Sequence, residues 1–155
     1  MLTGQHNHQL DGKGRFRIPA KLKKDGGFGA VIYLVQGYNK TITVYNETEY
    51  QKFVAEKTKE ATSGTIGSKV ALGMSRLIGS IEAVEDDGQG RYQLPSTLKK
   101  FALIEKDIVT LGIINKLEIW SKERWDAVES SDDFDDVLDE YLTQKAKNIN
   151  AVSKE

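Results

Sequence analysis

Two short motifs carry the side chains of this chain that are best suited to bind another molecule. The first runs from Asp11 to Arg15 (DGKGR) and the second from Asp87 to Arg91 (DGQGR). In each motif an aspartate precedes an arginine by four residues, and two glycines lie between them. An arginine can donate paired hydrogen bonds to a phosphate or to the edge of guanine, and a lysine adds a positive charge. The motifs therefore indicate binding of an anion or a nucleic acid.

The two motifs belong to a longer internal repeat. Residues 10–19 (LDGKGRFRIP) correspond to residues 86–95 (DDGQGRYQLP) at an offset of 76, which becomes 75 further along the chain. A repeat of this length predicts two related structural units. We expect a first unit over residues 1–61, a linker and helix over 62–79, a second unit over 80–129, a C-terminal helix over 130–147 and a tail over 148–155.

The motif sequences favour tight turns between strands. Asp-Gly is a common hairpin signal, and the second glycine of each motif can supply the positive φ that such a turn needs. A turn of this kind places Asp11 opposite Arg15, and Asp87 opposite Arg91. The alternating residues after the first turn predict a return strand that buries Phe16 and directs its arginines outward.

The elements that would hold these turns follow from the apolar pattern. Continuous apolar runs predict buried strands, each followed by a pairing strand: residues 30–35 with 41–45, and 107–112 with 117–120. Pro19 and Pro95 favour the start of short helices. Asn46, with Glu49 three residues later, predicts a capped helix. The chain is therefore expected to adopt a β-rich α+β fold.

Composition narrows the class of protein. A length of 155 residues allows one domain or two small ones, and the chain has no cysteine. No apolar run approaches the roughly 20 residues of a membrane span, and the N-terminus does not resemble a signal peptide. Residues 1–125 contain 19 Lys and Arg against 14 Asp and Glu, whereas residues 126–155 contain 3 against 9. A basic body can attract a partner that carries phosphate, and the acidic C-terminal segment can oppose that attraction. The absence of cysteine fits a reducing compartment, and we expect a cytoplasmic protein.

Catalysis and metal binding are not expected. His6 and His8 would share one face of a strand, but the sequence offers no third ligand beside them. The acids Asp132, Asp133, Asp135 and Asp136 stand at the start of a helix, where the helix dipole favours them. We therefore predict no enzyme activity, no cofactor and no metal site.

The paired motifs, together with residues 118–125 (EIWSKERW), resemble the MraZ family of bacterial transcriptional regulators over about residues 1–126. The resemblance implies two AbrB-like swapped-hairpin barrels with flanking helices, in a ring-shaped homo-oligomer whose motif loops gather on one face. It also implies association with the nucleoid and control of the division and cell-wall gene cluster. Gln89, at the tip of the second motif, and Arg17, after the first, depart from the family pattern.

The hypothesis from the sequence is a sequence-specific DNA-binding regulator of that cluster and of its own promoter, which binds tandem direct repeats in double-stranded DNA. The residues expected to contact DNA are Lys13, Arg15, Arg17, Gln89 and Arg91, with Asp11 and Asp87 orienting the arginines. A rival assignment makes the Asp–Arg pairs internal staples of the turns. Two other classes stay open, namely a structural ring-forming scaffold and an antitoxin-like repressor with the same fold.

Overall fold

The two sequence repeats contribute interleaved strands to the same sheet. The computed structural model describes residues 1–62, 67–131 and 133–153. Met1–Arg124 form the first unit and Trp125–Glu155 the second. The expected linker between the repeats falls largely on residues 63–66, outside the described residues. Because both repeats contribute strands to one sheet, neither repeat forms a separate body.

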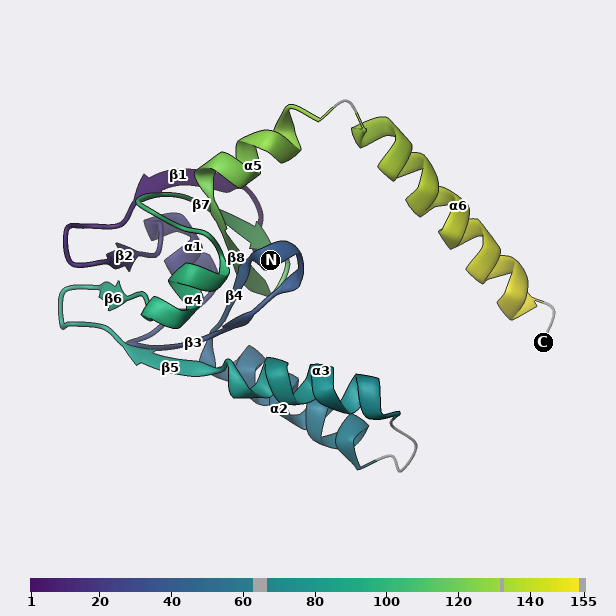
Figure 1. Cartoon of the computed structure of the whole chain (residues 1–155), viewed down its shortest axis with the longest axis horizontal. Helices are drawn as coiled ribbons and strands as arrows, with labels where there is room; N and C mark the ends of the chain where they lie inside the picture. The colour runs from purple at the N-terminus through teal and green to yellow at the C-terminus, as the bar shows by residue number, and fades with distance from the viewer. Residues whose placement is uncertain (63–66, 132, 154–155) are drawn as a thin grey trace. The chain divides into compact units, whose positions relative to one another are not determined.

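A six-stranded antiparallel sheet organises the first unit (Figure 1). Its strand order is β1-β7-β8-β4-β3-β5, so each outer strand pairs with a strand of the other repeat. This arrangement confirms the expected class, a mixed α and β fold built from two swapped repeats. The strands are β1 (Gln5–Gln9), β3 (Val31–Gln36), β4 (Ile42–Tyr45), β5 (Glu82–Glu85), β7 (Asp107–Ile113) and β8 (Lys116–Ser121).

A second, two-stranded sheet joins the segments that follow the motifs. It consists of β2 (Arg15–Arg17) and β6 (Arg91–Gln93), paired antiparallel. The prediction that the strands before and after the first turn pair with each other is wrong. β1 pairs with β7, and β2 pairs with β6, because the chain turns tightly at the motif and then continues toward the other repeat.

Several helices begin where the sequence signals indicate. Pro19 and Pro95 precede α1 (Ala20–Asp25) and α4 (Ser96–Phe101), and the Asn46 side chain accepts a 2.8 Å hydrogen bond from the Glu49 N–H at the start of α2 (Glu47–Ala61). Ser121 caps the helix that follows β8, because its side chain accepts a hydrogen bond from the Arg124 N–H. The remaining helices are η1 (Tyr38–Lys40), α3 (Ser68–Gly79), α5 (Lys122–Glu129) and α6 (Phe134–Ser153).

One hydrophobic core supports both motif segments. Phe16 and Tyr92 face each other across the β2–β6 pair, with 2% and 0% of their surfaces exposed and ring centroids 5.8 Å apart. Leu22 and Leu98, from the two short helices, are buried in the same cluster. The inward direction predicted for Phe16 is confirmed. Because its neighbours along β2 point the other way, Arg15 and Arg17 are available at the surface.

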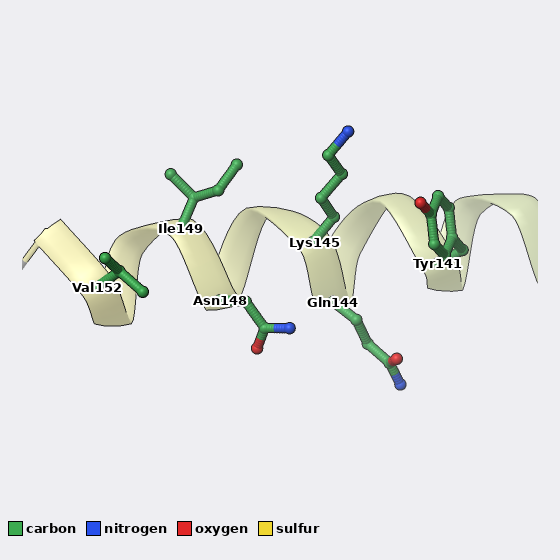
Figure 2. A pocket seen from close by; sticks show the side chains of 6 residues that line it. All are labelled: Tyr141, Gln144, Lys145, Asn148, Ile149 and Val152. Atoms are coloured by element: carbon green, nitrogen blue, oxygen red, sulfur yellow. The ribbon is translucent and has the colours of Figure 1, made fainter. Parts of the chain in front are cut away.

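Helix α6 carries an exposed apolar stripe in the second unit. It begins at Phe134 and ends at Ser153, later at both ends than the expected range 130–147. Ile149 and Val152 continue the helical spacing of Tyr141, so the segment expected as a tail stays helical as far as Ser153. Lys145 and Ile149 extend to one side of the helix, and Gln144 and Asn148 to the opposite side (Figure 2). All six labelled residues belong to α6, so they form an open helix surface.

Two general features bear on function. Among the described residues, no helix is both long enough and apolar enough to cross a bilayer. The same residues contain no group of three or more histidine and acidic side chains arranged to hold a metal ion.

Candidate nucleic-acid interface

The first motif loop (residues 11–15) is closed by the aspartate at its base. The Asp11 N–H donates to the Arg15 carbonyl at 2.9 Å, and the Gly14 N–H donates to the Asp11 carbonyl at 3.0 Å. One carboxylate oxygen of Asp11 accepts from the Lys13 and Arg15 N–H groups, each at 2.9 Å. The other oxygen accepts from Nε of Arg15 at 2.7 Å. Asp11 therefore fixes both the loop backbone and the plane of the Arg15 guanidinium.

The second motif loop (residues 87–91) repeats this arrangement. Oδ1 of Asp87 accepts from the Gln89 N–H at 2.9 Å and from the Arg91 N–H at 3.2 Å. Oδ2 accepts from Nε of Arg91 at 2.5 Å. The loops also share a left-handed glycine, since φ is +77° at both Gly14 and Gly90. Each aspartate therefore accepts hydrogen bonds from both the side chain and the backbone of its arginine and closes its turn.

The two loops lie next to each other on one side of the unit (Figure 1). In the β2–β6 pair, Arg15 is opposite Gln93 and Arg17 is opposite Arg91. Nη1 of Arg15 lies 3.4 Å from Oδ2 of Asp87, in the other repeat. The structure thus brings Arg15, Arg17 and Arg91 together, although Arg15 and Arg91 are 76 residues apart in sequence. Lys13 and Gln89 are exposed at the loop tips.

The hydrogen bonds lower the pKa values of both motif aspartates. For Asp11, the main cause of the lowered pKa is the backbone N–H of Arg15. Desolvation acts to raise the pKa of Asp87, but the N–H of Gln89 and the side chain and N–H of Arg91 together lower it to about 2. Both groups are therefore carboxylates at neutral pH. Each arginine keeps a fixed negative partner, which limits how far its guanidinium can move.

Lys23 is a basic residue of this surface that lies outside both motifs. Its Nζ lies 5.6 Å from the centre of the Tyr92 ring, and a Cβ placed on Gly90 would meet that nitrogen at 3.4 Å. The repeat contained a signal for it, because Leu22-Lys23-Lys24 recurs as residues 98–100. The Lys23 ammonium adds positive charge beside the second motif loop.

His8 makes a contact within the six-stranded sheet. Nε2 of His8 is 2.7 Å from Oγ1 of Thr110, on the neighbouring strand. Burial lowers the pKa of His8, and the charge of His6 lowers it further. His8 is therefore neutral at physiological pH and fits a structural contact within the sheet.

Comparison with known proteins matches nearly the whole chain. The family model described as "MraZ protein, putative antitoxin-like" matches residues 1–66 and 77–144. The protein "Transcriptional regulator MraZ" of Caldanaerobacter subterraneus subsp. tengcongensis is 37% identical over 152 residues, which cover 97% of this chain and 99% of the relative. The protein of the same name from Lachnoclostridium phytofermentans is 36% identical over 141 residues, covering 90% and 94%. That from Lactobacillus delbrueckii subsp. bulgaricus is 39% identical over 142 residues, covering 90% and 93%.

Proposed function

The chain belongs to the MraZ family, and we propose that it is a DNA-binding transcriptional regulator that recognises specific sequences through its two motif loops. The observation that carries this proposal is the joining of the loops by the β2–β6 pair, with Arg15 and Arg91 each oriented by a carboxylate. The relatives named above are called transcriptional regulators. A two-stranded ribbon of this kind fits the major groove of B-DNA.

Each basic or amide side chain of the loops has a suitable role on DNA. Arg15 and Arg91 would donate to guanine edges or phosphates, while Lys13 at the first tip would neutralise a phosphate. Gln89 at the second tip would donate or accept a hydrogen bond without charge. An arginine has five N–H donors, so the bond from Nε to an aspartate can fix the guanidinium while other donors face the DNA. Orientation and stapling are thus compatible with DNA contact.

The targets and the assembly form the second part of the proposal. By its family membership, the protein would control the division and cell-wall gene cluster and its own promoter, in the cytoplasm and at the nucleoid. A ring-shaped homo-oligomer would present one pair of loops per subunit, and tandem direct repeats would engage several pairs at once. Linked contacts of this type raise the overall affinity without a new interface.

Footprinting on the DNA upstream of the protein's own gene tests target, spacing and autoregulation together. We expect protection of short, regularly repeated segments, and loss of that protection when Arg15 and Arg91 are both changed to alanine. Uniform protection without repeated segments, equal for the parent and the double variant, would refute recognition through the loops.

A further inference from the structure

Each motif loop is held at its tip by a side chain from the strand of the other loop. Nη1 of Arg17, on β2, donates a hydrogen bond to the carbonyl oxygen of Gln89. In the opposite direction, Nε2 of Gln93, on β6, donates to the carbonyl oxygen of Lys13 at 2.9 Å and to that of Gly14 at 3.3 Å. Both contacts join backbone of one repeat to a side chain of the other.

The two contacts are related by the internal repeat. At the offset of 76, Gln93 corresponds to Arg17 and Gln89 corresponds to Lys13. In each repeat, therefore, the residue six positions after the motif aspartate donates to the carbonyl at the tip of the other loop. One of these donors is a charged guanidinium and the other a neutral amide. The shared requirement is a hydrogen-bond donor of sufficient reach, and a positive charge is not needed for it.

We propose that Arg17 and Gln93 are positioning residues that lock the two motif loops into one DNA-binding surface. This inference rests on the proposed DNA-binding function and changes the role of Arg17 within it. The guanidinium of Arg17 acts mainly through the second loop, and Gln93, which the sequence did not indicate, performs the same task for the first loop. The lock fixes the separation of Lys13 and Gln89, the two exposed tips.

The geometry shows why such a lock matters. The ladder between β2 and β6 has only three residue pairs, and the bonds that each motif aspartate makes to its own loop backbone do not fix one loop relative to the other. The Arg15–Asp87 ion pair joins the bases of the loops, whereas Arg17 and Gln93 reach the tips. Holding the tips before DNA arrives reduces the conformational entropy lost on binding.

Paired substitutions separate the donor from the charge. Arg17→Gln and Arg17→Met both remove the positive charge, but only glutamine keeps a side-chain donor. Gln93→Arg and Gln93→Met give the reciprocal pair for the first loop. Lys21→Gln, at an exposed position on α1, controls for loss of one positive charge. We expect Arg17→Gln to bind operator DNA about as Lys21→Gln does. Arg17→Met should bind roughly 3- to 10-fold more weakly than Arg17→Gln, the effect of one lost hydrogen bond.

A second measurement tests the Arg17 and Gln93 contacts in the absence of DNA. Hydrogen exchange on the full-length protein should become faster in the peptide that contains residues 87–91 for Arg17→Met. The peptide that contains residues 11–15 should exchange faster for Gln93→Met. The donor-keeping variants Arg17→Gln and Gln93→Arg should retain the exchange of the parent. This crossed pattern distinguishes a contact between the loops from a general loss of stability.

Three results would overturn the proposal, and each has a different meaning. Equal loss of affinity for Arg17→Gln and Arg17→Met, with a salt slope lower by about one and unchanged loop exchange, would make Arg17 a phosphate contact. Faster loop exchange with unchanged DNA binding would make the lock purely structural. A parent protein that exchanges as expected but binds no upstream DNA would refute the proposed function itself.

Discussion

Nη1 of Arg15 lies 3.4 Å from Oδ2 of Asp87, so the arginine of the first motif reaches the aspartate of the second. The same oxygen accepts from Nε of Arg91 at 2.5 Å. Asp87 thus holds one arginine from each repeat. Because the two guanidinium groups share a carboxylate, a substitution in one motif should change the contacts of the other. The free-energy effects of substitutions in both motifs should therefore not be additive.

Replacement of either motif arginine tests the central contact. Arg15→Ala and Arg91→Ala should each weaken binding to the specific site by roughly 1–3 kcal/mol, if the lost contact is a bidentate bond to a base. Titration of a labelled operator fragment measures this loss. Lys59→Ala, at the exposed C-terminal part of α2, serves as the control cation. Arginine variants that bind no worse than this control would assign the Asp–Arg pairs to turn stability alone.

Lys13 should contribute affinity without sequence preference, because it is an exposed charge at the loop tip. Lys13→Ala should weaken binding to operator and random DNA about equally. The negative slope of log K against log salt should become less steep by about one. Gln89→Lys is the reciprocal change at the equivalent position. It should strengthen binding to both DNAs and make the salt dependence steeper by a similar amount. A Lys13 effect confined to the operator would contradict this prediction.

Local chemistry made much of the candidate site predictable. The Asp-Gly spacing indicates the closed turn and the proximity of Asp11 to Arg15, and alternation correctly directs Phe16 inward. These features depend on residues close in sequence, whose preferences are fixed by turn and strand geometry.

Pairing between the repeats was not predictable in the same way. Equivalent strands of a duplicated sequence have similar patterns, so periodicity does not decide whether β2 pairs with β1 or with β6. Alternation placed Arg17 on the outer surface but could not show that its partner is the Gln89 carbonyl. Lys23 and Gln93 join the site only because the swapped topology brings the second loop beside them.

Acid should weaken the fold through the motif aspartates. The pKa of Asp87 is lowered from 3.8 to about 2 in the folded protein, so its stabilising contribution is present above about pH 4 and is lost as the pH falls toward 2. Thermal unfolding followed between pH 2 and 6 should show a smaller pH dependence for Asp87→Asn than for the parent. Asp25→Asn, at the end of α1, controls for loss of one negative charge. Parallel curves for Asp87→Asn and the parent would contradict the assignment.

Self-association is expected from the size of the repeats and from family membership. Sedimentation velocity at micromolar concentration should show a homo-oligomer with a defined mass. Dilution should lower the affinity for an array of sites more steeply than the affinity for a single site, because only the array uses several subunits. A monomer at micromolar concentration that still binds the array tightly would refute the assembly.

The spacing of the operator repeats provides the most stringent test of the whole arrangement. If neighbouring subunits present equivalent loop pairs, tandem direct repeats near one helical turn apart, about 10–10.5 base pairs, place each repeat on the same face of the DNA. Insertion of about half a turn moves the second repeat to the opposite face, where the loops of the next subunit cannot reach it. Affinity should fall toward that of a single repeat, and insertion of a full turn should restore part of it. A mobility-shift assay with these three spacings measures the effect. Equal affinity at all spacings, with Arg15→Ala still binding like the parent, would refute both the contact assignment and the multivalent mode of binding.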